Sequence, residues 1–300
     1  MKKIFNSITI FAIATLFLAA CGSAPSGGDG ALNVLASTTF LADIAQNVAG
    51  DRLKVESLLP IGSDPHSYQA APADVAKIAE SKVLILNGLE YEHFIEPLLE
   101  NTGGERLMIE ATTGLNPKED AGSEHGVDPH MWLDPNLVIT YVENIRDGLI
   151  QADPASAEIY KANADAYIAQ LKELDKWIVE QVDAIPADRR LLVTNHEAMG
   201  YFADRDGFEV AGSVIPSFSS NASPSAQEMA GLIDGIKKLN VPAIFLDTAD
   251  NDVLAKQIAD ETGVMIVADL HLESLTDGAP APTYIDMMKD NVSKIVEALK

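Results

Sequence analysis

The same order of strand-like and helix-like segments occurs twice in this chain, and this repetition restricts the fold more than any other feature. Residues 32–101 and 190–270 each contain an apolar strand, a polar turn, a helix, a strand ending in proline, a loop, a helix started by proline and another apolar strand. Strands that alternate with helices predict parallel sheets with helices on both faces. We therefore expect an α/β fold of two similar lobes, with ligands bound beyond the carboxyl ends of the strands.

A single long helix is predicted between the two lobes. Residues 153–186 carry apolar side chains at helical spacing, with Asp153 as a capping residue, Pro154 in the first turn and Pro186 at the end. About thirty residues at ~1.5 Å per residue make a stiff rod of roughly 45 Å. The expected domains are an N-terminal lobe at 32–150, a connecting helix at 151–186 and a C-terminal lobe at 187–300.

The start of the chain has the composition of a leader followed by a tether. Residues 1–20 combine basic residues with an apolar core, as secretory signal peptides do. The sequence LAAC at 18–21 resembles the lipobox of bacterial lipoproteins, and Cys21 is the only cysteine in the chain. We expect lipidation of Cys21 to anchor the protein at the extracytoplasmic face of the cell membrane, with 21–31 as a flexible tether rich in Gly, Ser and Pro.

The chain is strongly acidic, with a formal net charge of −24 at pH 7. Nucleic-acid binding needs a basic surface, so this charge excludes nucleic acid as a partner. A strongly acidic surface also raises the local concentration of cations.

The tripeptide Asp-Pro-His occurs twice in a chain with six histidines, in GSDPHSYQ at 62–69 and in GVDPHMWLDP at 126–135. Proline fixes its own φ and pushes the preceding residue into an extended conformation. A histidine next to so rigid a pair loses little freedom when it binds a ligand. His66 and His130 are therefore candidate ligand-binding residues on loops that open into the cleft between the lobes.

His196 and Glu273 complete the candidate site. His196 lies where the first strand of the C-terminal lobe turns into its helix, and Glu273 follows the last apolar strand. His271 is two residues from Glu273, so in an extended segment both side chains face the same way and either could be the fourth ligand. Three imidazoles and one carboxylate suit Zn²⁺, and they would hold Mn²⁺ more weakly.

Other residues of these motifs have simpler interpretations. His93 is expected on the surface of a helix, and His125 in a solvated acidic loop. Trp132 is expected to pack beside the site. Three aspartates are expected to form turns or to accept hydrogen bonds from imidazole N–H groups: Asp64, Asp128 and Asp134.

Three longer stretches of the chain resemble a known family. The sequences LLPIGSDPHSYQAAPADVAKIAESKVLILNGLEYE, DPHMWLDPNLV and NHEAMGYFADRDG are similar to the metal-binding lipoproteins of bacterial ABC importers, the cluster A-I (or cluster 9) substrate-binding proteins for zinc and manganese. The resemblance covers residues 32–300 together with the lipobox. It implies two α/β lobes joined by one long helix, with a metal ion buried between them.

The resemblance also implies the metal ligands, which are His66, His130, His196 and Glu273. It favours Glu273 over His271, although the family commonly has Asp at that position. Zinc-type members have His at the position of His196, where many manganese-type members have Glu. We therefore expect Zn²⁺, with Mn²⁺ as the alternative. The His-rich loop of many zinc-type members is short and acidic here, and a lone cysteine excludes the disulfide found in some of them.

The predicted function is high-affinity binding of a divalent metal ion by a monomeric receptor, which delivers the ion to the membrane permease of an ABC importer and catalyses no reaction. Two alternatives belong to other classes. A zinc hydrolase would need a second histidine where Gly200 stands, four residues after His196, and an open coordination position for water. An adhesin role has often been attributed to this family, but no motif in this sequence specifies such a partner.

Overall fold

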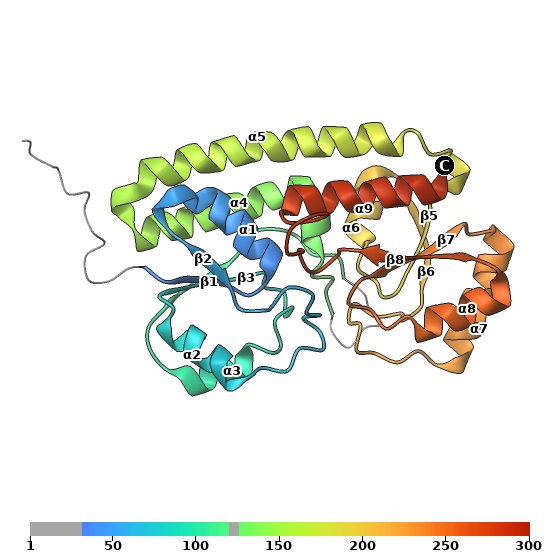
Figure 1. Ribbon diagram of the computed structural model, residues 1–300, viewed down its shortest axis with the longest axis horizontal. Helices are drawn as coiled ribbons and strands as arrows, with labels where there is room; N and C mark the ends of the chain where they lie inside the picture. Colours follow the sequence, from blue (N-terminus) through green and yellow to red (C-terminus); the bar gives the residue numbers. More distant parts are fainter. Residues whose placement is uncertain (1–31, 120–125) are drawn as a thin grey trace, which may run out of the picture. The chain divides into compact units, whose positions relative to one another are not determined.

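Two parallel four-stranded sheets form the frame of the computed structural model, which describes residues 32–119 and 126–300 (Figure 1). Residues 32–300 form one unit. The predicted signal peptide, Cys21 and the tether lie outside the described residues, and so does His125. Within the described ranges, no helix combines the length and the apolar character needed to cross a membrane.

The N-terminal sheet has the strand order β2-β1-β3-β4, and all neighbouring strands are parallel. Its strands are β1 (Val34–Ala36), β2 (Val55–Ser57), β3 (Val83–Leu86) and β4 (Leu107–Glu110). The crossovers contain α1 (Thr39–Ala49), α2 (Pro72–Glu80) and α3 (Glu96–Thr102). The central strand β3 reads VLIL and is buried throughout, as expected for a parallel strand covered on both faces.

The C-terminal sheet has the order β6-β5-β7-β8 and is also parallel. Its strands are β5 (Leu191–Thr194), β6 (Glu209–Ser213), β7 (Ala243–Asp247) and β8 (Met265–Leu270). The crossovers contain α6 (Gly200–Asp206), α7 (Ala226–Leu239) and α8 (Val253–Thr262). Both sheets therefore have the same order of strands: the second strand of each lobe lies at an edge beside the first, and the third and fourth follow on the other side of the first. This shared order confirms the predicted pair of similar lobes.

Helix α7 begins later than its sequence predicts. Ser223 and Pro224 have the pattern of a cap and a first helical residue, but α7 begins at Ala226 with Ser225 as its cap. Ser225 Oγ accepts a hydrogen bond from the N–H of Glu228 at 3.2 Å, and the Glu228 carboxylate accepts one from the N–H of Ser225 at 2.6 Å. This capping box satisfies two N–H groups at once, which explains why the helix begins here.

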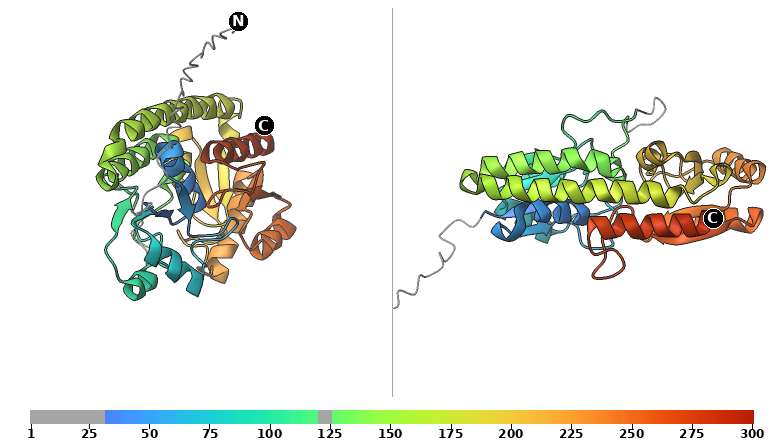
Figure 2. Two further views of the ribbon diagram at one scale, coloured as in Figure 1. Left: turned by 60° about the vertical axis from the view of Figure 1, so that its left-hand side comes forward. Right: turned by 90° about the horizontal axis from the view of Figure 1, so that it is seen from above.

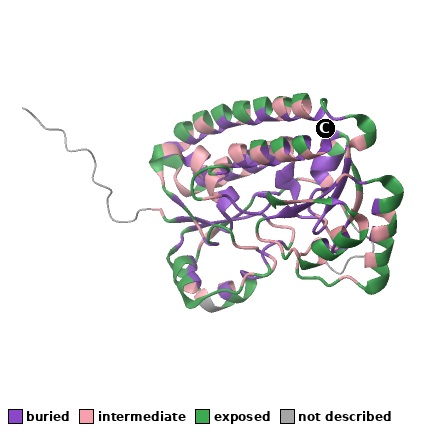
Figure 3. Cartoon of the chain, turned by 45° about the vertical axis from the view of Figure 1, so that its right-hand side comes forward, coloured by how far each residue is buried: buried purple, intermediate pink, exposed green. Residues whose placement is uncertain are grey.

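A long helix, α5 (Ala157–Val182), runs beside α4 (Pro135–Ala152) and α9 (Tyr284–Leu299), as Figures 1 and 2 show from three directions. It is shorter than the predicted helix at both ends, because Pro154–Ser156 forms a separate 3₁₀ turn and the helix already ends at Val182, before Pro186. Asp153 occupies the N-cap position of that turn, but its side chain makes no capping hydrogen bond there. Its carboxylate accepts a hydrogen bond from the Tyr160 hydroxyl at 2.9 Å instead. The inner face of α5 is buried and its outer face is exposed (Figure 3), which is the pattern of an amphipathic surface helix.

One apolar cluster extends through both lobes. It contains Val34 and Ile145 from the N-terminal part, Tyr167 from α5, and Leu192 and Leu299 from the C-terminal part. Wide separation of the lobes would expose this packed core to water, which costs free energy in proportion to the apolar area. The fold therefore favours local loop movements over wide opening.

Candidate metal site

The four predicted ligand residues meet between the two sheets. His66 lies on the loop after β2, His130 on the loop between β4 and α4, His196 directly after β5 and Glu273 directly after β8. Each follows the carboxyl end of a strand, where parallel sheets bind their ligands. One donor atom from each residue lies within 4.8 Å of the donor atoms of the other three. The two lobes therefore contribute two side chains each to this cluster.

The four side chains point toward a common centre. Glu273 Oε1 lies 3.0 Å from Nε2 of His66. It lies 3.4 Å from Nε2 of His130 and 3.3 Å from Nε2 of His196. The exposed fraction is 7% for the His66 side chain and 3% or less for the other three. Three imidazole nitrogens and a carboxylate in so small and dry a space suit a divalent ion of borderline softness.

Asp128 orients the ring of His130. Its Oδ1 accepts a hydrogen bond from His130 Nδ1 at 2.8 Å and another from the His130 main-chain N–H at 3.0 Å. Burial lowers the pKa of His130, but the hydrogen bonds with Asp128 and Glu273 outweigh burial and raise the pKa to about 9. With Nδ1 directed at Asp128, Nε2 faces the cluster, so a cation that binds there must displace a proton.

The Glu273 carboxylate is ionised although it is buried. Burial raises the pKa of Glu273, but the charge of His66 and the hydrogen bonds from the three histidines hold that pKa well below its usual range. A buried carboxylate needs compensating positive charge. The contacts with the three histidines compensate the carboxylate in the metal-free protein, and a bound cation can take over this role.

Two aspartates that the sequence analysis missed support the C-terminal half of the cluster. Asp247, the last residue of β7, accepts hydrogen bonds from the N–H groups of Leu272 and Glu273. Asp250 Oδ1 lies 3.9 Å from His196 Nδ1. Burial is the main cause that raises the pKa of Asp247 to about 7 and that of Asp250 to about 6. Asp247 ends the apolar strand β7, and this position was the sequence signal that could have identified it; Asp250 lies in the turn that follows.

His271 lies outside the cluster. Strand β8 ends at Leu270 and the chain then bends, so the side-chain alternation of an extended strand does not continue to Glu273. The His271 N–H donates to Asn291 Oδ1 at 2.7 Å, and His271 Nε2 lies 3.8 Å from Asp290 Oδ2. Of the two candidates for the fourth position, only Glu273 joins the three histidines.

The remaining motif residues occupy supporting positions. Trp132 packs beside the cluster as predicted, with its ring centroid 4.5 Å from that of Phe40 and 5.1 Å from that of His130. Asp64 accepts from the His66 N–H at 2.8 Å and thereby forms a turn, while Asp134 caps α4. His93 is exposed as predicted, but it lies in a turn before α3 and not in a helix.

Tyr91 is a further residue beside the cluster that the sequence did not reveal. Its ring meets that of His66 edge-on, with centroids 5.4 Å apart and an interplanar angle of 84°. Its hydroxyl is buried and has no hydrogen-bond partner within the described part of the chain. Burial, followed by the charge of Glu273, raises the pKa of Tyr91 well above its usual value. Tyr91 and Phe218 line a cavity of about 20 Å³ beside His66, which has room for about one water molecule.

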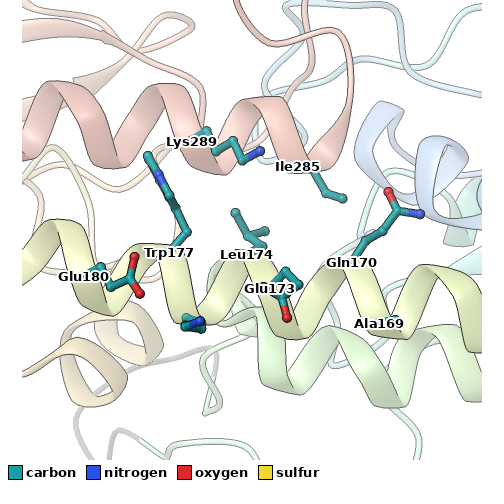
Figure 4. Close-up of a pocket in the computed structure, with 9 residues that line it drawn as sticks. Ala169, Gln170, Glu173, Leu174, Trp177, Glu180, Ile285 and Lys289 are labelled. Carbon is teal, nitrogen blue, oxygen red and sulfur yellow. The ribbon is translucent and has the colours of Figure 1, made fainter.

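A larger groove of about 520 Å³ lies between α5 and α9 (Figure 4). Leu174, Trp177 and Ile285 supply its apolar part, and charged residues such as Glu180 and Lys289 border it. None of the four clustered residues lines this groove. Its volume therefore gives no information about the cluster.

Comparison with known proteins gives the same architecture. The periplasmic zinc-binding protein TroA from Treponema pallidum superposes with a TM-score of 0.82 and 28% identity, over 90% of this chain and 99% of that one. A manganese-binding lipoprotein, MntA of Halalkalibacterium halodurans, is 37% identical over all of this chain and 99% of its own length. A metal ABC transporter substrate-binding lipoprotein, SsaB of Streptococcus sanguinis, is 30% identical over 100% and 99% of the two chains.

Two parallel-sheet lobes with a buried three-histidine, one-glutamate cluster between them define the class: a substrate-binding protein of the ABC-importer type, and not an enzyme. The family follows from the sequence match. Residues 34–298 match the family described as zinc-uptake complex component A, periplasmic, and the chain belongs to that family. The resemblance identified from the sequence motifs is thereby confirmed.

Proposed function

We propose that this protein captures a divalent transition-metal ion outside the cytoplasmic membrane and delivers it to the membrane permease of an ABC importer. The observation that carries this proposal is the convergence of His66, His130, His196 and Glu273, with donor atoms within 4.8 Å of one another. Family membership supports the same function. The protein acts as a monomer in this proposal.

The number of metal-donor side chains in the cluster, four, favours binding of an ion over catalysis. Four protein ligands fill the coordination shell of a tetrahedral ion, whereas a catalytic zinc keeps one position open for water. Burial of all four side chains also favours slow exchange, because the ion has little contact with solvent. The position that a hydrolase motif would fill with histidine holds Gly200, the first residue of α6.

Zinc is the metal that we propose, with manganese as the alternative. Three nitrogen donors and one oxygen form a softer and less anionic site than one with two carboxylates, and divalent zinc binds such sites more tightly than manganese. The name of the MntA relative supports manganese, and that of TroA supports zinc. The two metals therefore have to be compared directly in the purified protein.

The test is metal analysis of protein purified without chelator, followed by competition titrations with Zn²⁺ and Mn²⁺. We expect one ion per chain and tighter binding of zinc. Replacing His66, His130 or His196 by Ala should weaken binding by more than the roughly 10- to 100-fold typical of losing an outer hydrogen-bond partner. His93→Ala is the control, because His93 is exposed and outside the cluster. Binding that survives the three cluster substitutions would refute the proposal.

We also propose that Cys21 carries the lipid anchor and that residues 22–31 tether the folded part to the membrane. The lipobox pattern and the single cysteine support this assignment. Expression of Cys21→Ala in a bacterial host should release the protein from the membrane fraction without changing its metal affinity. Retention of that variant in the membrane fraction would refute lipidation at this position. We further propose that the N-terminal lobe begins near residue 32, the connecting helix near 151 and the C-terminal lobe near 187.

A further inference from the structure

We propose that Ser220 and Asn221 form a latch that controls the rate at which the bound metal leaves. This inference rests on the proposed function, because it concerns release of the ion from the same cluster. The latch residues belong to the loop between β6 and α7, in the C-terminal lobe. Their partners belong to the loop after β2 that carries His66, in the N-terminal lobe.

The latch consists of two side-chain hydrogen bonds between the lobes. Ser220 Oγ donates to Asp64 Oδ2 at 2.7 Å, and Asn221 Nδ2 donates to the main-chain oxygen of His66. Asp64 links Ser220 to the backbone of the His66 loop. Its Oδ1 accepts a hydrogen bond from the His66 N–H at 2.8 Å, and its Oδ2 accepts another from Ser67 Oγ at 2.8 Å. The latch therefore acts on the backbone that positions the His66 ring, without touching the donor atom of that ring.

The other end of the latch loop is fixed to the His196 segment. The N–H of Ile215 donates to the Asn195 carbonyl at 2.7 Å, and the N–H of Glu197 donates to the Ser217 carbonyl at 2.9 Å. Backbone hydrogen bonds thus hold the start of the latch loop beside His196. The side chains of Ser220 and Asn221 hold its tip beside His66. Closing the loop fixes the position of His66 relative to His196.

His66 is also the side chain through which the ion can most easily be exposed. Its exposed fraction of 7% is the highest in the cluster, and Phe218 and Ser219 of the latch loop line the cavity beside it. The remaining three side chains are covered by the packed interior of the protein. Loops held by a few partly exposed hydrogen bonds open at lower free energy than packed cores do. Release should therefore begin with opening of the latch and displacement of the His66 loop.

The experiment measures the rate of zinc release from the loaded full-length fold into excess chelator, by stopped flow, for Ser220→Ala, Asn221→Ala and the double variant. Loss of both hydrogen bonds should accelerate release about 10- to 100-fold. Ser220→Thr keeps a hydroxyl group and should restore a rate close to that of the wild type. Ser223→Ala is the matched control: Ser223 lies in the same loop, is exposed and makes no hydrogen bond in the described structure.

Two further measurements separate a latch from a merely structural role. The melting temperature of the metal-free protein should change little in the double variant, because the latch is at the surface of the cleft and outside the core. The variant should still bind one ion per chain. An unchanged release rate, or equal acceleration in Ser223→Ala, would overturn the latch while leaving metal binding intact. Failure of the wild-type protein to bind metal would overturn the proposed function and the latch together.

Discussion

Asp128 and His130 form a fixed pair in which one carboxylate oxygen accepts from both the imidazole Nδ1 and the main-chain N–H of the same histidine, at 2.8 and 3.0 Å. The double contact fixes the ring in two places. It also determines which nitrogen faces the cluster, because Nδ1 is occupied by the hydrogen bond with Asp128 and Nε2 points toward the other three side chains. The rigid Asp-Pro-His sequence therefore supplies both the imidazole and its partner.

We predict that Asp128→Asn weakens metal binding by about 10- to 100-fold, because the neutral amide is a poorer acceptor and polarises the imidazole less. Competition titration against a chelator of known affinity measures this change. Asp134→Asn is the control, since asparagine caps a helix as well as aspartate does and Asp134 caps α4. Equal affinities for the wild type and Asp128→Asn would contradict the role assigned to this pair.

Asp247→Asn should weaken both the metal site and the fold. Its carboxylate accepts from the N–H groups of Leu272 and Glu273 and, at 2.7 Å, from that of Ala249. An amide leaves at least one buried N–H without its acceptor, which costs about 1–3 kcal/mol. We expect a lower melting temperature of the metal-free protein and weaker metal binding. A variant with the stability and the affinity of the wild type would show that Asp247 does not position Glu273.

His196→Glu tests the argument for zinc. A second carboxylate makes the site harder and more anionic, which favours manganese relative to zinc. We predict that this substitution weakens zinc binding more than manganese binding, as measured by parallel competition titrations with both ions. His93→Ala, outside the cluster, should change neither affinity. Equal losses for the two ions would remove the chemical reason for preferring zinc.

The buried carboxyl group of Asp206 should make the free energy of unfolding depend on pH. Both of its carboxylate oxygens are buried without a hydrogen-bond partner in the described structure, and burial is the main cause that raises its pKa to about 7. The folded state therefore binds a proton more tightly than the unfolded state, in which the pKa is near 3.8. The resulting stabilisation is complete below about pH 4 and is lost as the pH rises through 7.

Asp206→Asn should accordingly stabilise the metal-free protein at pH 8 by roughly 1–3 kcal/mol, with a gain that shrinks as the pH falls toward 4. Urea unfolding of the variant and the wild type at pH 5 and pH 8 measures the difference. Asp188→Asn changes an exposed aspartate and should have no such effect. A gain that is equal at both pH values would contradict the assigned pKa.

Much of the fold could be predicted because it depends on local patterns. Apolar runs such as VLIL at 83–86 and AIFLD at 243–247 are long enough to identify buried parallel strands. The choice between Ser223 and Ser225 as the cap of α7 could not be made in the same way. It depends on a reciprocal contact with Glu228, which competes with the equally plausible pattern of Ser223 followed by Pro224.

The candidate site shows the same limit at longer range. The positions of His66, His130 and His196 follow from strand ends, which local sequence reveals. Spacing alone could not separate His271 from Glu273, because the answer depends on where β8 stops. Asp247 lies at the end of an apolar strand, which the sequence reveals, but its partners could not be predicted, because they are backbone groups 25 and 26 residues later in the chain.

The most direct test of the central claim is an anomalous-difference map from crystals of the protein loaded with one equivalent of zinc. We predict a single strong peak about 2.0–2.2 Å from Nε2 of each of the three histidines and from a carboxylate oxygen of Glu273. A peak at another place, or an ion that leaves two or more of these four side chains unbound, would contradict the account.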